Sequence, residues 1–491
     1  MAEDINKIID NKYEIERLID SGGYGDIYLV INIINKIKYA SKVLKKERAS
    51  IFDKNSFENE INILKKLSQK DNINKYISRL VAHGNGEIKK KDEKIEQPIY
   101  RHYLVIDYFE NGNLFYYIDK MDNGMEEKHA KIIFKKILEG IQFCHKNNIC
   151  HLDIKTENIL LDKDFNPIII DFGLSHECKD SMINLDKGHG TYKYMCPEII
   201  GKKNITCNGI KADIFSLGVL LFKLVTGKFC FPLAYKQDPC YKDIIKKNYK
   251  SFWETVKKNR TKKFLTEELK DLYVQMIARE PEERPSIDKI LDMKWMKDID
   301  EDEYKKLEND LKNEFLKLEK TIEDDNNEEI NTEPKKADEN KKLTVKSMDD
   351  ENQYFNSNIG PKKFDKNEFA NHSIKIKGYF NPNQFMNHLI SCIGKDFDNI
   401  KFSKENLSFK AFFIPEKFIE IDDNEDNEDN EENEEDEDED ERECIINISL
   451  VESGKDEYFI QFWREKGGIE EYYEKFKKIK KIILSLLNYF S

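Results

Sequence analysis

Two neighbouring stretches of the sequence hold residues whose types and spacing suit a chemical reaction. The first, at 151–158, reads His-Leu-Asp-Ile-Lys-Thr-Glu-Asn, and the second is an Asp-Phe-Gly triplet that begins at Asp171. Asp153 can accept a proton from an attacking hydroxyl group, and Lys155 can neutralise charge on a transferring phosphoryl group. Asn158 and Asp171 offer hard oxygen ligands of the kind that Mg²⁺ prefers. Together these groups indicate metal-assisted phosphoryl transfer.

A predicted β-hairpin would bring the two metal ligands together. The apolar runs at 159–161 and 168–170 read as short strands around a turn at 162–167. Asn158 lies directly before the first strand, and Asp171 lies directly after the second. Because the outer ends of two antiparallel strands lie side by side, both ligands are expected at one site.

A glycine-rich hairpin and a strand with a lysine precede these stretches. Strands expected at 13–18 and 26–33 flank Ser-Gly-Gly-Tyr-Gly at 21–25. Glycines in such a turn let backbone N–H groups approach phosphates closely. The strand expected at 39–44 carries Lys42, whose ammonium group would be costly to bury without a partner.

The partner of Lys42 should be a glutamate of the helix expected at 57–67. Apolar residues recur there at spacings of three and four, and Glu60 stands beside that apolar face. Glu58 is the alternative partner on the same helix, and we favour Glu60. An ion pair at this point would tie the strand to the helix.

These motifs, in this order and spacing, resemble those of eukaryotic protein kinases of the serine/threonine type. The sequence is similar to calcium/calmodulin-dependent, AMP-activated-kinase-related and checkpoint kinases. The resemblance implies an α+β bilobal kinase fold, with a β-rich N-lobe at 13–108 and a helical C-lobe at 109–298. It also implies transfer of the γ-phosphate of ATP to Ser/Thr hydroxyls of protein substrates, with Mg²⁺ as cofactor.

The resemblance assigns roles to individual residues. It implies that Ile106 is the gatekeeper of the nucleotide cleft. The implied catalytic residues are Asp153, Lys155 and Asn158, and the implied metal ligands are Asn158 and Asp171. The implied nucleotide contacts are Ile19, Gly22, Gly23, Tyr24, Gly25, Ile27, Ala40, Lys42, Glu60, Asp107, Phe109 and Leu160.

The resemblance also implies contacts that hold the site in place. Thr191 would hydrogen-bond the catalytic aspartate and lysine, and Asp213 would anchor the backbone of the catalytic loop. Glu198 would form a buried ion pair with Arg284. Loss of one member of such a pair strands a charge, at a cost of about 3–5 kcal/mol.

Four positions depart from the family pattern or qualify it. Asp20 stands where the first glycine of the loop belongs, which would reduce nucleotide affinity. The resemblance implies that 171–198 is the activation segment. Leu152 replaces the arginine that binds a phosphate on this segment, so phosphorylation of its residues 175–191 is not expected to be an obligatory on-switch. Asn113 replaces a glutamate, which would weaken a ribose or substrate contact. Glu157 favours substrates with basic residues before the acceptor.

The alternative interpretation is a pseudokinase scaffold that binds nucleotide weakly and works through its tail. Asp20 and Leu152 favour it. The leading interpretation, an active kinase, depends on a set of intact positions: Lys42, Asp153, Asn158 and Asp171.

Length and charge bound the organisation of the chain. At 491 residues the chain exceeds what one core supports, so two or three domains are expected. The net charge is −14, but residues 422–443 alone hold 17 Asp/Glu and one Arg, so the remainder carries about +2. The global charge therefore predicts no partner, and we expect no nucleic-acid binding.

Cysteine usage and the apolar runs bear on location. Nine cysteines occur without a Cys-x-x-Cys pair, which suggests reduced thiols and a cytoplasmic or nuclear protein. The N-terminus lacks a basic stretch followed by an apolar one, so no secretory signal is expected. The longest apolar runs, such as 217–225, are far short of a membrane span.

Several segments outside the kinase-like part have distinct patterns. Residues 1–12 form an N-terminal tail, and the polar stretch 83–97 predicts an enlarged surface loop. At 299–322 apolar residues recur every three or four positions, which predicts an amphipathic helix. This helix could pack on the C-lobe, form a coiled coil or block the site, and we favour packing. The polar segment 323–367 predicts a flexible linker.

The last segment, 368–491, is expected to be a small α+β domain. The strand expected at 457–463 and the helix expected at 469–487 weakly resemble the end of the kinase-associated domain 1. In that family the domain binds acidic phospholipids or inhibits the kinase, and a lysine-rich helix suits either role. The acidic run 422–443 is expected to be a disordered insert that masks the lysines. Control of activity would then lie in this C-terminal region.

Overall fold

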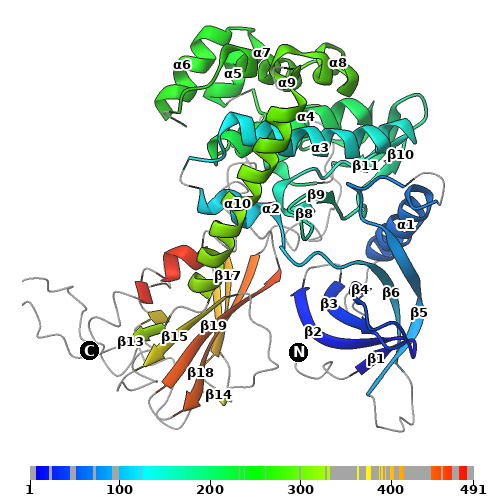
Figure 1. The fold of residues 1–491 in the computed structure, drawn as a ribbon, viewed down its shortest axis with the longest axis vertical. Helices are drawn as coiled ribbons and strands as arrows, with labels where there is room; N and C mark the ends of the chain where they lie inside the picture. Colours follow the sequence, from blue (N-terminus) through cyan, green and yellow to red (C-terminus); the bar gives the residue numbers. More distant parts are fainter. Residues whose placement is uncertain are drawn as a thin grey trace, which may run out of the picture. The chain divides into compact units, whose positions relative to one another are not determined.

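In the computed structural model the chain forms two compact units. Figure 1 labels their helices and strands. The first consists of Met1–Ile37, Gly86–Tyr100 and Glu323–Ser491, and the second consists of Lys38–Asn85 and Arg101–Ile322. The structure describes residues 7–21, 25–44, 51–69, 73–90, 99–121, 123–188, 190–231, 233–236, 238–259, 261, 263–297, 300–326, 329–331, 362–363, 372–377, 386, 389–390, 393, 399–402, 408–413, 444–454, 457–466, 475–480 and 482–483.

The first unit begins with a three-stranded antiparallel ladder. Strands β1 (Lys7–Ile9), β2 (Tyr13–Ser21) and β3 (Gly25–Asn32) pair in sequence order. Asp10 and Asn11 turn the chain between β1 and β2 at φ of 50° and 53°, a left-handed conformation that short polar side chains tolerate. The three residues of β1 also pair with the end of β5 (Leu80–Lys90).

That pairing corrects two predictions from the sequence. Residues 1–12 were expected to form a tail, but Lys7–Ile9 are strand β1, which pairs with β2 and β5. The stretch 83–97 was expected to be a surface loop, but residues up to Lys90 continue strand β5. The polar composition misled because backbone hydrogen bonding to β1, with Ile88 opposite Ile9, holds this arm extended. Residues 91–98 lie outside the described part of the chain.

The C-terminal part of the first unit contains a seven-stranded sheet, in the order β13-β15-β19-β18-β17-β16 with β14 paired to β18. Apolar side chains of the central strands are buried at alternate positions, as in Ile446, Ile448 and Leu450. Phe476, at a helical position, packs edge-on against Phe462. The strands are β13 (Glu329–Asn331), β14 (Lys362–Lys363), β15 (His372–Lys377), β16 (Asn399–Phe402), β17 (Ser408–Phe413), β18 (Cys444–Gly454) and β19 (Glu457–Lys466). The segment 323–367 was expected to be a flexible linker, but β13 and β14 lie within it and pair with β15 and β18. The acidic run 422–443 lies outside the described residues.

The second unit starts with strands and continues with helices. Strand β4 (Lys38–Leu44) pairs with β6 (Ile99–Asp107), and α1 (Ile51–Leu67) follows β4 in the chain. The helices that follow are α2 (Leu114–Lys120), α3 (Glu127–Lys146), α4 (Gly209–Thr226), α5 (Pro239–Ile245), α6 (Tyr249–Asn259), α7 (Glu267–Met276), α8 (Ile287–Asp292), α9 (Lys294–Lys297) and α10 (Glu301–Asn326). This sequence of a strand-rich part and a helical part is the expected α+β bilobal kinase arrangement.

Short strands between α3 and α4 carry most of the candidate site. They form three two-stranded antiparallel pairs, whose members are β7 (Ile149–Cys150) with β10 (His176–Glu177), β8 (Ile159–Leu161) with β9 (Pro167–Ile169), and β11 (Met182–Lys187) with β12 (Lys203–Asn208). The β8–β9 pair is the hairpin that the sequence predicts at 159–170.

Helix α4 is the centre of the second unit. Nearly all of its residues are buried, as its apolar composition on every face predicts. The Asn208 side chain caps its first turn, and Gly227 ends it in a left-handed conformation at φ 71°. Gly124 lies so close that a Cβ atom there would approach the Gly227 nitrogen to 2.5 Å, so only glycine fits.

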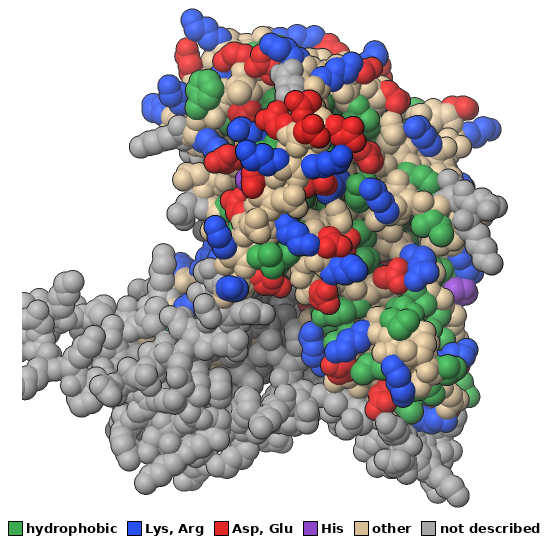
Figure 2. All heavy atoms as spheres, in the orientation of Figure 1, with side chains coloured by type: hydrophobic (Ala, Val, Ile, Leu, Met, Phe, Trp, Pro, Cys, Tyr) green, Lys and Arg blue, Asp and Glu red, His purple; other side chains and the backbone are tan. Residues whose placement is uncertain are grey.

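The surface and the cysteines agree with the composition. On the face shown in Figure 2, Lys/Arg and Asp/Glu side chains intermingle over the second unit, so this face carries no field of one sign. The seven cysteines whose side chains are described are all unbridged and buried. Among the described residues, no helix is both long enough and apolar enough to span a membrane.

Candidate active site

Helices α3 and α4 anchor the loop that carries Asp153. Asp213 of α4 accepts hydrogen bonds from the backbone nitrogens of His151 and Leu152, both at 2.8 Å. His145 of α3 contacts the same carboxylate at 2.9 Å. These bonds hold Leu152 at φ 63°, a left-handed conformation that a branched side chain rarely adopts unaided. The expected anchoring role of Asp213 is therefore visible in the geometry.

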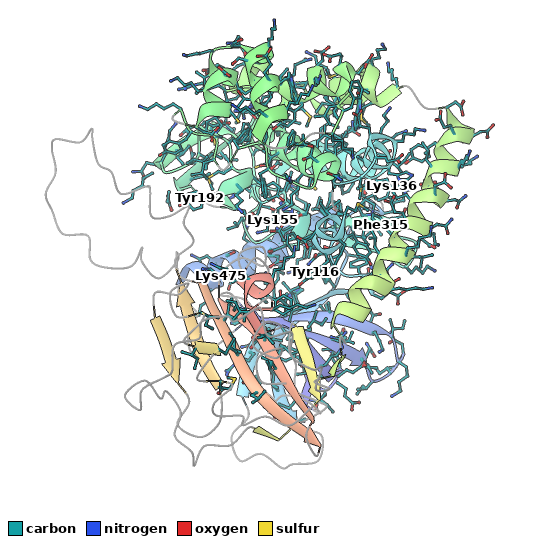
Figure 3. The ribbon with its side chains drawn as sticks, turned by 90° about the vertical axis from the view of Figure 1, so that its left-hand side faces the viewer. Tyr116, Lys136, Lys155, Tyr192, Phe315 and Lys475 are labelled. Atoms are coloured by element: carbon teal, nitrogen blue, oxygen red, sulfur yellow. The ribbon has the colours of Figure 1, made fainter. Side chains whose placement is uncertain are left out.

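Three side chains close into a compact cluster at Asp153. The Lys155 ammonium lies 2.7 Å from Asp153 Oδ2 and donates to Thr191 Oγ1 at 2.7 Å. The Thr191 hydroxyl in turn donates to Asp153 Oδ1 at 2.9 Å. Asp153 is buried, and the two neighbours fix the direction in which its carboxylate points. The arrangement leaves a carboxylate and an ammonium group side by side. Figure 3 labels Lys155 in the second unit.

The β8–β9 hairpin places the two expected metal ligands at its open end. Asn158 ends a short 3₁₀ turn, and its side-chain nitrogen donates to both Oδ2 and the backbone oxygen of Asp153, each at 2.9 Å. The backbone nitrogen of Ile170 donates to the Asn158 carbonyl at 3.0 Å, which closes the hairpin beside Asp171. Asp171 adopts φ 61°, and its side chain is 42% exposed.

This pair of ligands fits Mg²⁺ bound together with a substrate phosphate. The amide oxygen of Asn158 and the carboxylate of Asp171 are hard oxygen donors, and Mg²⁺ usually takes few protein ligands and completes its shell with phosphates and water. Within the described part of the chain, no cluster of three or more His, Cys, Asp or Glu side chains could hold a metal by itself.

Lys42 bridges two carboxylates across the second unit. Its ammonium lies 2.7 Å from Glu60 Oε2 and 3.3 Å from Asp171 Oδ1. Glu60 is buried, whereas Glu58 is exposed, so Glu60 and not the alternative is the partner. Burial works to lower the pKa of Lys42, but the Asp171 and Glu60 carboxylates outweigh it and raise that pKa.

The pKa values of the two carboxyl groups beside Lys42 are shifted in opposite directions. Burial raises the pKa of Glu60 despite the attraction of Lys42. For Asp171, desolvation is outweighed by Lys42 and then Lys155, so its pKa is lowered. Asp171 is therefore the ionised member over the wider pH range, as a cation ligand should be.

Two polar residues of α1 hold the start of the activation segment, and sequence reasoning missed both. Ser56 donates to the Gly173 carbonyl at 2.8 Å, and Asn59 donates to the Ser175 carbonyl at 2.7 Å. A signal was available, because Ser56 stands four residues before Glu60 and so shares its helix face.

The predicted nucleotide contacts are distributed over several elements. Ile19 lies in β2, and Gly25 and Ile27 lie in β3, where Asp20 pairs with Ile27 after a register shift. Gly22, Gly23 and Tyr24 lie outside the described residues. In the second unit, Ala40 and Lys42 lie in β4, Glu60 in α1, Asp107 at the end of β6, Phe109 just after it, and Leu160 in β8.

Residues after β6 have structural contacts of their own. Asp107 forms a two-bond pair with Arg79 at 2.9 and 3.1 Å. Asn113 caps α2 by accepting from the Tyr116 nitrogen at 3.3 Å and forms a β-bridge to Leu160. The departure from glutamate at Asn113 therefore supplies a helix cap, a preference that asparagine meets well.

The activation segment is closed by a buried ion pair. Arg284 donates two bonds to the carboxylate of Glu198, at 2.6 and 2.7 Å. Its remaining donors reach the carbonyls of Ala278, Lys211 and Arg279 at 2.8, 2.9 and 3.0 Å. All five N–H groups of the guanidinium are thus used, and the Arg284 side chain has no exposed surface.

The chain is similar in sequence to known protein kinases. Residues 13–296 match the model of the protein kinase domain. The chain is 32% identical to the probable serine/threonine-protein kinase MARK-B of Dictyostelium discoideum, over 58% of this chain and 36% of that protein. It is 30% identical to CBL-interacting protein kinase 26 of Oryza sativa subsp. japonica, over 60% of this chain and 54% of the relative.

A third relative is CBL-interacting serine/threonine-protein kinase 20 of Arabidopsis thaliana, at 29% identity over 65% of each chain. The chain thus spans less than two thirds of the length of each of these relatives. The family model nevertheless covers more than half of the chain, from before the glycine-rich hairpin to α9. The chain therefore belongs to the protein kinase family.

Proposed function

We propose that this chain is an active serine/threonine protein kinase, which transfers the γ-phosphate of ATP to hydroxyl groups of protein substrates with Mg²⁺ as cofactor. The observation that carries the proposal is the cluster of Asp153, Lys155 and Thr191, closed by contacts of 2.7 to 2.9 Å. A scaffold that only bound nucleotide would have no need to orient a carboxylate beside an ammonium in this way.

The residues of the chain have separable tasks in such a transfer. Asp153 takes the proton of the acceptor hydroxyl, and Lys155 stabilises negative charge on the phosphoryl oxygens. Thr191 holds both side chains in register. Lys42, steadied by Glu60, binds the phosphates that are not transferred. Mg²⁺ held by Asn158 and Asp171 would neutralise phosphate charge.

A peptide-array experiment tests the proposal and its specificity together. The wild-type chain should phosphorylate Ser/Thr peptides, and Asp171→Asn should abolish the signal. The pseudokinase alternative predicts nucleotide binding without transfer in either protein. Glu157, which accepts a bond from Thr156 at 2.8 Å, supports a preference for basic residues before the acceptor, and the array should rank such peptides first.

We further propose that phosphorylation of the activation segment is not the obligatory on-switch. Leu152 is partly buried against apolar residues, and it cannot form a charge-assisted pair with a phosphate. The ladder of β11 with β12 gives the segment another support. A phosphatase-treated preparation should keep its activity. An inactive preparation that gains full activity only after phosphorylation of 175–191 would refute this proposal.

The tail is proposed to regulate the kinase, and a kinase-associated-domain-1-like fold that binds acidic phospholipids is one route. Lys477 and Lys478 are exposed on its helical segment. The tethered acidic run 422–443 would compete with anionic lipids for such lysines. Deletion of 422–443 should raise binding to anionic vesicles at low salt, and unchanged binding would contradict the masking idea. The proposed location is the cytoplasm or nucleus.

A further inference from the structure

Helix α10 follows the kinase-like part and buries one face in the core of the second unit. Three apolar residues on that face, Leu307, Leu311 and Phe315, are buried, and Phe315 has no exposed surface at all. Leu316, the next residue, is 40% exposed on the other side of the helix. Figure 1 shows α10 crossing α3. Within this unit the predicted amphipathic helix therefore packs on the helical part, as expected.

The Phe315 ring closes an aromatic cluster with one residue of α2 and one of the β8–β9 turn. Its centroid lies 4.9 Å from that of Tyr117 and 5.5 Å from that of Phe165. Tyr117 and Phe165 also meet edge-on, at 6.0 Å. Phe165 adopts φ 60°, a strained conformation for an aromatic residue, which the surrounding rings help to hold. Figure 3 shows Phe315 directed from α10 toward the interior.

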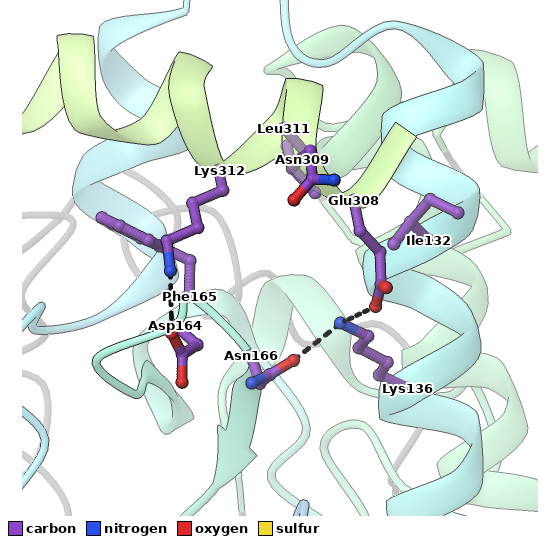
Figure 4. A pocket seen from close by; sticks show the side chains of 9 residues that line it. All are labelled: Ile132, Lys136, Asp164, Phe165, Asn166, Glu308, Asn309, Leu311 and Lys312. Atoms are coloured by element: carbon purple, nitrogen blue, oxygen red, sulfur yellow. Dashed lines mark hydrogen bonds and ion pairs between the residues drawn. The ribbon is translucent and has the colours of Figure 1, made fainter. Parts of the chain in front are cut away.

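Ion pairs also connect α10 to the turn at 162–166 (Figure 4). Lys136 of α3, which is almost wholly buried, contacts Glu308 of α10 at 2.6 Å and Asn166 of the turn at 2.7 Å. On the other side of the small cavity between these elements, of about 280 Å³, Lys312 of α10 pairs with Asp164 at 2.7 Å. Both pairs therefore fasten α10, directly or through Lys136, to residues 162–166.

The 162–166 turn is the closed end of the β8–β9 hairpin, and the expected metal ligands lie at its open end. Strand β8 begins directly after Asn158, and β9 ends two residues before Asp171. Each strand has three residues, and so short a hairpin is marginal without packing from outside. These two strands link the turn that α10 contacts to the residues that would hold the metal.

We infer that α10 is a positioning element of the metal site, acting through the 162–166 turn, with Phe315 as its central residue. The inference rests on the proposed kinase function and adds a means of regulation to it. The second unit ends at Ile322, inside α10, which runs on to Asn326. The helix thus continues covalently into the C-terminal region, and a signal that bends or displaces α10 reaches Asn158 and Asp171 without entering the nucleotide cleft.

The test compares two full-length variants, Phe315→Ala and Leu316→Ala. The second also removes an apolar side chain, but from the exposed side of α10. The first readout is hydrogen–deuterium exchange of peptides covering 158–171 in protein without nucleotide or metal. Phe315→Ala should speed exchange there, and Leu316→Ala should not. The second readout is kinetic. A misplacement of reacting groups by about 1 Å can lower the rate by about 10²-fold. Phe315→Ala should therefore lower kcat about tenfold and raise the Mg²⁺ concentration needed for half-maximal activity.

A purely structural role for Phe315 would give a different result. It would lower the unfolding temperature but leave exchange at 158–171, kcat and the Mg²⁺ requirement unchanged at a temperature where the variant is folded, which would overturn the inference. If Phe315→Ala does not fold, the milder double variant Glu308→Gln, Lys312→Gln decides by the same readouts. Absence of phosphoryl transfer in the wild-type chain would instead refute the kinase proposal and leave the exchange result to judge the inference.

Discussion

Substitution Glu198→Gln should destabilise the second unit strongly, because it leaves the buried charge of Arg284 without its counter-charge. The Arg284 side chain is fully buried and directs two of its five hydrogen bonds to the Glu198 carboxylate. Breaking such a buried pair costs about 3–5 kcal/mol. For a unit of this size, each kcal/mol lowers the unfolding temperature by about 2 °C, so the expected shift is about 6–10 °C. Thermal unfolding followed by circular dichroism measures it.

The matched control is Glu283→Gln, which breaks the ion pair with Lys247 nearby in the sequence. That pair is exposed, with 40% and 60% of the two side chains accessible, so its loss should cost less than about 1 kcal/mol. Equal melting temperatures for Glu198→Gln and Glu283→Gln would refute the assignment of a structural role to the buried pair.

Two further predictions concern the pKa of Glu60 and the close approach of Gly124 to Gly227. Because burial raises the pKa of Glu60, activity should fall on the acid side as this carboxyl group takes up a proton and Lys42 loses its partner; Glu60→Gln should lower the plateau and remove that limb of the pH–rate profile. Gly124→Ala places a Cβ 2.5 Å from the Gly227 nitrogen at a φ of 64° and should cost about 1–3 kcal/mol in urea unfolding.

The catalytic stretch could be predicted in detail because its geometry is local. Asn158 and Asp171 flank two short apolar runs, and the hairpin that these runs form brings the two ligands together. The sequence favoured Glu60 over Glu58 from its place beside the apolar face of the helix, and the structure confirms it, because Glu60 is buried against Lys42 and Glu58 is exposed. Motif spacing therefore located the residues, and tertiary packing confirmed the choice between neighbours.

What the sequence could not supply were contacts between elements distant in the chain. The apolar face of α10 is visible as a pattern, but nothing in that pattern names Phe165 or Lys136 as the surface that covers it. Only the part of β5 from His83 to Lys90 was predicted as a loop, because its polar residues and two glycines hide the backbone pairing of this strand with its neighbours. The bonds of Ser56 and Asn59 to the activation segment were missed for the same reason.

The most direct test of the central claim is the rate of phosphate transfer from ATP to a Ser/Thr substrate by the wild-type chain and by Asp153→Asn. Asparagine keeps the size of the side chain and can still bond Thr191, but it cannot accept the substrate proton. The account predicts measurable transfer by the wild type, a loss of about 10²–10⁴-fold in the variant, and unchanged ATP affinity. A wild-type chain that binds ATP but transfers no phosphate, or a variant as fast as the wild type, would contradict it.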